Sequence, residues 1–138
     1  MATFNKIPLS GSTNGKGILI AATSTLGTTI HTAGSGTANF DEVWLYASNN
    51  STSSVKLTVE YGSASVQDNI EITIPGESGL VLVVPGLFLN NSLVVTAFAA
   101  VTNVITIHGY INNLSPKDCL IKGTDLSAQI IQKIGARI

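Results

Sequence analysis

Two histidines, His31 and His108, are the residues of this sequence whose chemistry first suggests catalysis. Histidine acts as a general base when a nucleophile and an orienting carboxylate lie beside it. Both residues fall in strand-like segments far apart in the sequence, and no G-x-S-x-G nucleophile motif is present. We therefore expect the hydrogen-bonding groups of both histidines to have partners within the fold or at an interface. The alternative is a small hydrolase that uses His31 or His108.

The acidic residues offer neither a working carboxylate pair nor a dedicated metal loop. Asp41 and Glu42 are adjacent, so on a strand they point to opposite faces. The stretch QDNIE supplies oxygen ligands from Asp68, Asn69 and Glu71, but it lacks the dense Asp/Asn/Gly spacing of a calcium loop. We therefore predict no catalytic residue, no metal site and no cofactor.

The stretch GSTNGKG, residues 11–17, matches a phosphate-binding loop only in part. In the pattern G-x-x-x-x-G-K-[ST] a Ser or Thr follows the lysine, whereas here Gly17 follows Lys16 and no helical pattern comes next. We expect a turn that leads into a strand.

Three aromatic residues, Trp44, Tyr46 and Tyr61, offer a platform for stacking on a sugar ring. Aromatic residues make up only 6% of the chain, however, and packing in a core or at an interface accounts for them more simply. In the stretch DEVWLYA, strand alternation places Trp44 and Tyr46 on the face of Glu42, opposite Val43. We predict that Trp44 and Tyr46 lie under a loop or at a subunit interface.

The composition indicates a protein that associates with others. The 138 residues fit one domain, and charged residues make up 11% of the chain, against roughly 25% in typical soluble domains. With so few charged residues, electrostatic repulsion between copies of the protein is weak, which favours stable association with partners. Residues 1–116 carry three lysines and six acidic residues, whereas residues 117–138 carry four basic and two acidic ones. That basic excess is too thin for a nucleic-acid-binding arm.

A long apolar run without any charged residue extends from Ser78 to Pro116 and raises the question of a membrane segment. A membrane helix needs about 20 apolar residues without strong breakers. Pro85-Gly86 and Asn90-Asn91 divide this run into short pieces rich in Val, Ile, Thr and Phe. We predict about three strands and no membrane segment, and we expect part of the run to face another subunit.

The whole chain has the periodicity of an all-β protein. The clearest alternation is in SVKLTVEY, where Val55, Leu57 and Val59 share one face. We predict a single eight-stranded antiparallel β-sandwich, jelly-roll-like, with an immunoglobulin-like sandwich as the alternative. The expected strands lie at about Lys16 to Ser24, Thr28 to Ala33, Phe40 to Ser48, Ser54 to Tyr61, Asn69 to Pro75, Gly79 to Val84, Leu93 to Ala100 and Val104 to Ile111. The corresponding division is an N-terminal arm (1–15), the sandwich (16–114) and a C-terminal tail (115–138).

The C-terminal tail has a different texture and is predicted to be a short helix or an extended arm. Leu126, Ile130 and Ile134 recur at helical spacing, Thr124 suits a helix cap and Gly135 suits a helix end. An apolar stripe of this size must be covered, either by its own sandwich or by another subunit. The residues predicted at a subunit interface are Leu120, Ile121, Leu126, Ile130, Ile131, Ile134, Trp44 and Tyr46.

The redox chemistry of the chain is simple. Cys119 is the only cysteine, so no disulfide forms within the chain. The N-terminal residues lack the pattern of a secretory signal peptide. We therefore expect assembly in a reducing cytoplasm.

Four stretches carry a resemblance to a known group of proteins: LSGSTNGKG, TTIHTA, DEVWLYASN and GLVLVVPGLFLNN. Over about residues 6 to 114 the sequence resembles small virion proteins of tailed bacteriophages. Residues 117–138 depart from that pattern, so expectations for them rest on their residues alone. The resemblance implies a non-enzymatic structural part of a phage particle and supplies no catalytic residues.

The function that this resemblance implies is that of a capsid cement or decoration protein, which stabilises the head by bridging neighbouring capsid proteins. Small jelly-roll proteins of this kind are commonly homotrimers. The expected partners are further copies of the chain and the major capsid protein, with no nucleic acid, membrane or small-molecule substrate. The expected location is the capsid surface of the virion. The alternatives are a neck, tail or fibre component, and a carbohydrate-binding β-sandwich for host attachment.

Overall fold

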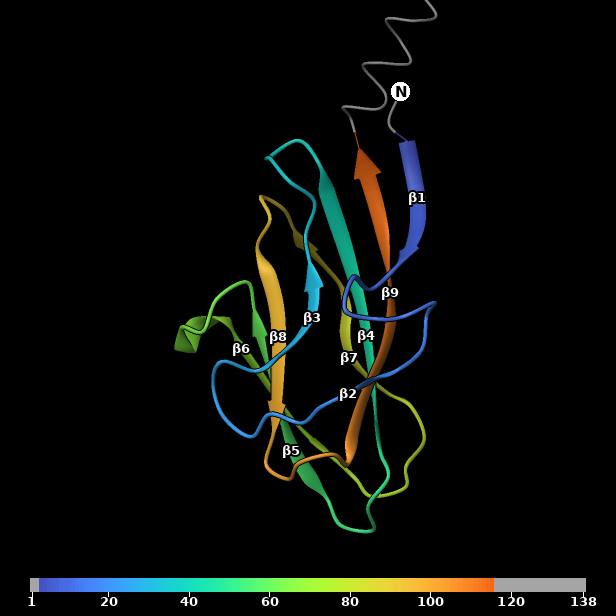
Figure 1. Ribbon diagram of the computed structural model, residues 1–138, viewed down its shortest axis with the longest axis vertical. Coiled ribbons are helices and arrows are strands. Elements are labelled where there is room, and N and C mark those ends of the chain that lie inside the picture. The colour runs from blue at the N-terminus through green and yellow to red at the C-terminus, as the bar shows by residue number, and fades with distance from the viewer. Residues whose placement is uncertain (1–2, 116–138) are drawn as a thin grey trace, which may run out of the picture.

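Nine strands make up the fold in the computed structural model, which describes residues 3–115 (Figure 1). Within these residues the only helical element is one 3-10 turn, η1 (Val66–Asp68). The strands are β1 (Thr3–Pro8), β2 (Ile18–Leu19), β3 (Thr28–Thr32), β4 (Phe40–Asn49), β5 (Val55–Tyr61), β6 (Asn69–Ile74), β7 (Val81–Leu89), β8 (Val94–Ala99) and β9 (Ile105–Ser115). The prediction of an all-β protein is confirmed.

The strands form two antiparallel sheets. Sheet A has the order β1-β9-β4-β7, and the short strand β2 joins it by pairing with β9. Sheet B has the order β3-β8-β5-β6. The first strand begins where the last one ends, because Thr3 pairs with Ser115, so the two ends of the described chain lie side by side at one end of sheet A (Figure 1).

The number of strands corrects the prediction of eight. Each of the eight predicted segments contains a strand, although the one predicted from Lys16 to Ser24 is reduced to β2. The ninth strand, β1, comes from residues predicted as an N-terminal arm. Its sequence, TFNKIP, has no alternating apolar face and ends in proline, so it is a strand because β9 pairs with it rather than because of its own pattern.

The core between the sheets is aliphatic. Alternate residues of β4 and β5 point inward, as their sequences predict, and Leu45 and Leu57 are completely buried. Burying one such side chain contributes about 1.5–3 kcal/mol. The other large residues that are completely buried are Leu9, Ile20, Ile30, Ile74, Ile105, Ile107 and Ile111. No aromatic residue of the described chain belongs to this fully buried core.

The charge-free run from Ser78 onward forms β7, β8 and β9, so the prediction of about three strands is confirmed. Across residues 3–115, no helix has the length and apolar character needed to cross a membrane. One detail differs from the prediction, because Pro85-Gly86 lies within β7 instead of dividing two strands. Strand β7 is an edge strand with irregular pairing around Trp44 and Pro85, and such edges tolerate a residue without an N–H group.

Candidate interaction face

The aromatic residues of the chain gather on the outer face of sheet A. Large aromatic side chains usually supply much of a protein core. Here strand alternation and pairing place six of the eight aromatic residues on the side of sheet A that faces away from sheet B. These six are Phe4, Phe40, Trp44, Tyr46, Phe88 and Tyr110. We call this surface the outer face of sheet A.

A stack of side chains crosses the middle of this face. Trp44 and Tyr110 are direct partners on β4 and β9, and their rings lie nearly parallel, 12° apart, with centroids separated by 6.1 Å. The Lys6 ammonium group on β1 lies 4.3 Å from the centroid of the Tyr110 ring. Because β1 and β4 flank β9 on opposite sides, the Tyr110 ring lies between a cation and an indole.

Gly86 gives Trp44 the room that it needs. A Cβ atom built on Gly86 would lie 2.9 Å from Cζ2 of Trp44, which is closer than real contacts allow. The backbone of Gly86 also has a φ of 81°, in the left-handed region that favours glycine. The indole of Trp44 therefore lies against bare backbone of β7.

Glu42 lies two residues before Trp44, on the same face of β4, and its carboxylate fixes the position of the indole. Its Oε1 atom accepts a hydrogen bond from Nε1 of Trp44 at 2.6 Å and another from Nδ2 of Asn112 at 3.0 Å. The hydrogen bond from Asn112, together with that from Trp44, lowers the pKa of Glu42 below its usual value, and burial opposes this only weakly. The face thus combines ordered rings with a carboxylate that stays ionised.

An apolar row occupies the end of the same face where β1 begins and β9 ends. Phe4 pairs with Leu114, and Leu114 pairs with Phe40. The Phe40 ring meets the Phe88 ring at a centroid distance of 5.0 Å and an interplanar angle of 48°. Phe4 is 63% exposed and Phe88 is 57% exposed, while Phe40 and Leu114 are half-buried.

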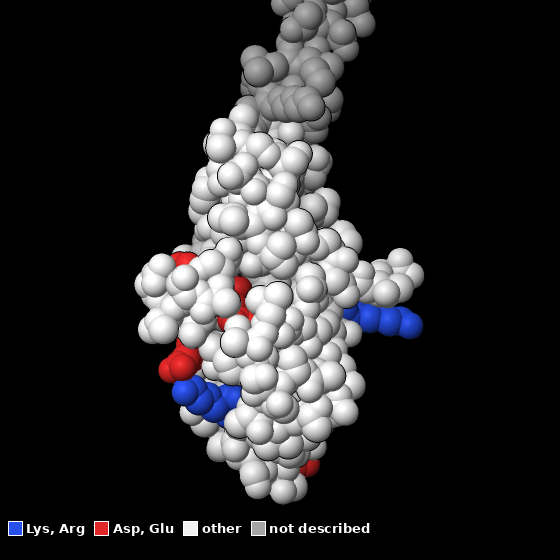
Figure 2. Space-filling view, turned by 60° about the vertical axis from the view of Figure 1, so that its left-hand side comes forward, with Lys and Arg blue, Asp and Glu red and all other residues white. Residues whose placement is uncertain are grey.

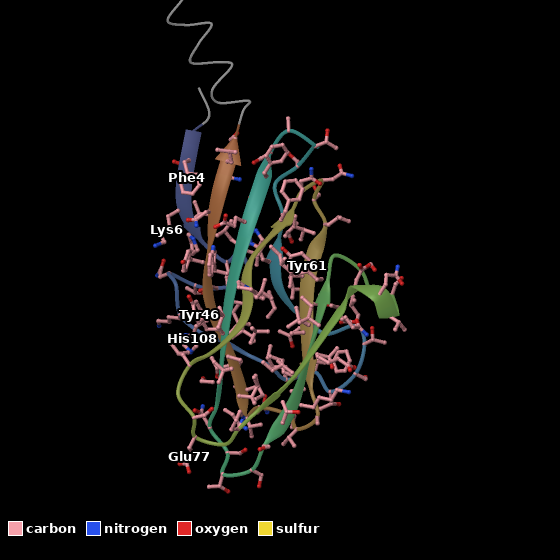
Figure 3. All side chains as sticks on the ribbon, turned by 180° about the vertical axis from the view of Figure 1, so that it is seen from behind. Phe4, Lys6, Tyr46, Tyr61, Glu77 and His108 are labelled. Atoms are coloured by element: carbon pink, nitrogen blue, oxygen red, sulfur yellow. The ribbon has the colours of Figure 1, made fainter. Side chains whose placement is uncertain are left out.

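Tyr46 and His108 lie beside each other toward the other end of the face. They are cross-strand partners, and both are half-buried. Figure 3 shows Phe4, Lys6, Tyr46 and His108 along the same outer side of sheet A, whereas Tyr61 lies on the inner side. The prediction that Trp44 and Tyr46 share a face with Glu42 is confirmed.

Charged side chains are sparse on the surface. Figure 2 shows one face of the molecule on which isolated charges interrupt a largely uncharged surface. An exposed ion pair on sheet B joins Lys56 to Glu71, with 3.1 Å between Nζ and Oε1. Exposed pairs of this kind contribute little to stability.

His31 is part of a buried polar network rather than an open site. Its Nδ1 atom accepts a hydrogen bond from the Ser10 N–H at 3.0 Å, so its proton lies on Nε2 and is donated to Oδ2 of Asp41 at 2.6 Å. Asp41 also accepts hydrogen bonds from the Gly34 N–H and from Nδ2 of Asn113. The network joins β3, β4, β9 and two loops, which suits a structural role.

This geometry bears on the hydrolase alternative. A general base needs a ring nitrogen that can take a proton from a nucleophile, and both nitrogens of His31 already have partners inside the protein. His108 belongs to the other sheet, so the two histidines do not form a common site.

Burial, together with the charge of Asp41, raises the pKa of Tyr61 well above its usual range. The Tyr61 hydroxyl therefore stays protonated and donates a hydrogen bond to the Leu87 carbonyl.

Glu60 is a second buried carboxylate and it holds a loop in place. The residue is 1% exposed on the outer side of sheet B, and it accepts hydrogen bonds from Thr25, from Thr96 at 2.7 Å and from the Gly27 N–H at 2.8 Å. Burial raises the pKa of Glu60, but the three hydrogen bonds outweigh that effect and leave it below 4.5. The carboxylate therefore fastens the segment between β2 and β3 onto sheet B.

Two shallow grooves flank this loop on sheet B. One has a volume of about 370 Å³, lies beside Leu26 and Leu93, and has no charged residue in its lining. The other has a volume of about 260 Å³ and lies between Thr23 and Phe98. In the described part of the chain, no group of three or more His, Cys, Asp or Glu side chains comes together in a manner suited to a metal ion.

The predicted interface residues fall into two groups. Trp44 and Tyr46 lie together on the outer face of sheet A. Leu120, Ile121, Leu126, Ile130, Ile131 and Ile134 lie outside the described residues, as does the predicted tail helix or arm. Sequence reasoning did not single out Lys6, Phe88, Tyr110 or Leu114. Their grouping with Trp44 depends on which strands are neighbours, and a single sequence carries no direct signal for that.

The outer face of sheet A, with its aromatic stack and apolar row, is therefore the surface best suited to bind another molecule. Comparison with known proteins adds no relative, since no protein family, no curated protein and no solved structure matches this chain.

Proposed function

We propose that this chain is a non-enzymatic structural protein of a virus particle, and specifically a capsid cement or decoration protein of a tailed bacteriophage. The observation that carries the proposal is the gathering of six aromatic residues on the outer face of sheet A while the core is left aliphatic. Aromatic residues are enriched, and charged ones depleted, at the centre of protein interfaces. The phage assignment itself rests on the resemblance of residues 6 to 114.

A jelly-roll topology belongs to the same proposal and is supported by nested strand pairing. The inner pair β5–β6 is enclosed in the sequence by the pairs β4–β7, β3–β8 and β2–β9, all antiparallel. The pairings β4–β9 and β5–β8 then join this folded ribbon into two sheets. A jelly roll is such a ribbon wrapped into a double sheet, and the architecture is common in viral capsid proteins and lectins.

In the proposed mechanism the protein acts by permanent association. Exposed apolar residues of β7 and its flanking loops extend the available surface beyond the apolar row, with Leu80 61% and Leu82 45% exposed. Burying such groups between subunits strengthens the shell without any chemical step. The proposed partners are further copies of the chain, as a homotrimer, and the major capsid protein on the capsid surface after assembly in the host cytoplasm.

Cryo-electron microscopy of particles that contain the protein tests the proposal. The cement role predicts density on the capsid surface in a copy number that follows the capsid lattice, with the outer face of sheet A against a neighbour. Density confined to the neck, tail or fibres would favour the alternative of a structural component at that position. The same map distinguishes the two, because a neck or tail has only a few copies of each part.

Carbohydrate binding for host attachment is the second candidate. The observation that favours it is the placement of the Trp44 indole beside Glu42 and Asn112, since sugar sites combine a ring with hydrogen-bonding groups. Tyr110 is less suited than Trp44 to stack on a sugar, because Lys6 and Trp44 lie beside its ring. A glycan array tests this candidate: a bound glycan that is lost in Trp44→Ala and kept in Phe98→Ala supports it, and an array without any binder removes it.

A further inference from the structure

The apolar row at the end of sheet A is an interaction surface with a definite extent. Its four residues, Phe4, Leu114, Phe40 and Phe88, come from β1, β9, β4 and β7 in the order of the sheet. Three spacings between neighbouring strands separate the first from the last, or about 14 Å. Phe4 and Phe88 expose more than half of their surface to water. A row of this kind requires an apolar partner to be withdrawn from solvent.

The chain itself supplies such a partner next to the row. Leu114 belongs to the row, and Ser115 is the last described residue, still paired with Thr3. The 23 residues that follow, 116–138, contain seven Leu or Ile residues: Leu120, Ile121, Leu126, Ile130, Ile131, Ile134 and Ile138. These 23 residues contain no aromatic residue.

Charge also favours this pairing. Residues 1–116 have three lysines against six acidic residues, a net charge of −3, whereas residues 117–138 have four basic and two acidic residues, a net charge of +2. Glu42, which pairs with Phe88 across β4 and β7, is an ionised carboxylate at the border of the row. The basic, apolar residues 117–138 therefore match this surface in two ways, because the row is apolar and Glu42 beside it carries the opposite charge.

The direction of β9 favours a segment that comes from another copy of the chain. Strand β9 runs toward the end of the sheet, and its pairing continues through Ser115 (Figure 1). Pro116 follows immediately, and the residue before a proline strongly favours an extended backbone. At its last described residue, β9 is therefore still directed away from its own row, toward any molecule that adjoins this end of sheet A.

We propose that the C-terminal segment, residues 117–138, of one copy binds the apolar row of a second copy. Exchange of these segments around a closed ring of copies would cover every row and hold the oligomer together. The inference deepens the proposed function, because it names the occupant of one part of the outer face of sheet A. It concerns the isolated protein, so it can fail while the location on a virus particle stands, and the reverse also holds.

The first test is chemical cross-linking of a mixture of isotopically labelled and unlabelled full-length chains, read by mass spectrometry. Lys6 lies on β1 beside Phe4, and Lys122 and Lys133 lie in the C-terminal segment. We expect cross-links from Lys6 to Lys122 or Lys133 that join one labelled and one unlabelled chain. Cross-links confined to single chains would mean that each segment covers its own row, and a monomer at all concentrations would mean that another protein covers it. Either result overturns the proposal.

The second test is the association constant of full-length variants, measured by light scattering over a concentration series. Phe88→Asp and Ile130→Asp should each weaken association by about tenfold or more, because each removes a buried apolar contact. The double variant should weaken it by much less than the product of the two effects, since both act on one contact. Val101→Asp is the matched control, because Val101 is 47% exposed but lies in the loop before β9, away from the row. Equal effects of Phe88→Asp and Val101→Asp would contradict the proposal.

Discussion

Trp44 and Tyr110 are cross-strand partners whose rings lie nearly parallel at the surface of sheet A, with 6.1 Å between their centroids. Stacked aromatic pairs on neighbouring strands contribute about 0.5–1.5 kcal/mol beyond their burial. A pair that is ordered in this way before binding loses little conformational entropy when a partner covers it. The pair is therefore suited to be the centre of an interface.

The first prediction concerns this pair. Trp44→Ala should lower the free energy of unfolding by only about 1–2 kcal/mol, because the indole is half-buried and outside the core. It should nevertheless weaken binding to particles severely. Binding is measured by co-sedimentation with particles lacking the protein, and folding by urea denaturation. Phe98→Ala is the control, since Phe98 is a half-buried aromatic residue of β8 in the other sheet. Equal loss of binding in both variants would refute the assignment of the face.

The second prediction concerns the space that Gly86 provides for Trp44. Gly86→Ala should destabilise the protein by more than Gly36→Ala, measured by urea denaturation. Both glycines have a positive φ, 81° for Gly86 and 75° for Gly36, so the backbone strain is matched at about 1–2 kcal/mol. Only at position 86 would the new Cβ also meet the indole, whereas nothing lies within 4 Å at position 36.

A double variant separates the two contributions at Gly86. When Trp44→Ala is already present, the added cost of Gly86→Ala should fall to that of Gly36→Ala, because the collision is gone and only the strain in φ remains. An unchanged cost would show that the indole does not limit this position.

The third prediction concerns the buried network around His31. Asp41→Ala should lower the free energy of unfolding by about 3–5 kcal/mol, because it removes the acceptor of His31 and of the Gly34 N–H in a buried site, whereas Nδ2 of Asn113 keeps Oδ1 of Asn39. Asp68→Ala, which removes a carboxylate that accepts only from Ser63 at the surface, should cost less than about 1 kcal/mol. Equilibrium urea denaturation measures both. Similar small values would mean that the network adds nothing to the fold.

The fourth prediction is a dependence of stability on pH that arises from Glu60. The pKa of Glu60 is lower in the folded chain than its usual value of 4.5, because its three hydrogen bonds outweigh the cost of burial. The carboxylate therefore stabilises the fold at pH values above 4.5, and this contribution is lost as the pH falls through the folded pKa. Urea denaturation from pH 7 down to pH 3 measures the effect.

A neutral variant identifies the group responsible. Glu60→Gln should flatten the fall in stability below pH 4.5 and should lower stability near pH 7, where the wild-type carboxylate is ionised. Glu77→Gln removes an exposed carboxylate and should leave the curve nearly unchanged. The assignment is wrong if the two variants give the same curve.

Much of the fold could be predicted from the sequence, because alternation is a local property. The pattern of SVKLTVEY places Leu57 in the core, and the position of Asp41 beside Glu42 sends one carboxylate inward and the other outward; both are confirmed. The strand β1 could not be predicted in this way. Its membership of sheet A depends on β9, more than 100 residues away in the sequence.

Only part of the outer face of sheet A could be predicted from the sequence. Trp44 and Tyr46 could be assigned to one face of their own strand, but Tyr110 and Phe88 join them only because β9 and β7 flank β4. Pro85-Gly86 is a turn-forming pair, so the sequence predicts a break between strands at this point. Pro85 lies instead on an edge strand, where the N–H donor that proline lacks is dispensable.

Hydroxyl-radical footprinting of the assembled particle tests the central claim most directly. The oxidation rate of each aromatic residue is compared between the isolated chain and the chain in its assembly. We predict that Trp44, Tyr110 and Phe88 become strongly protected on assembly, while Phe98, on the other sheet, keeps its rate. If Trp44 and Tyr110 are each oxidised as fast in the assembly as in the isolated chain, this result would contradict the claim that the outer face of sheet A is the surface through which this protein assembles.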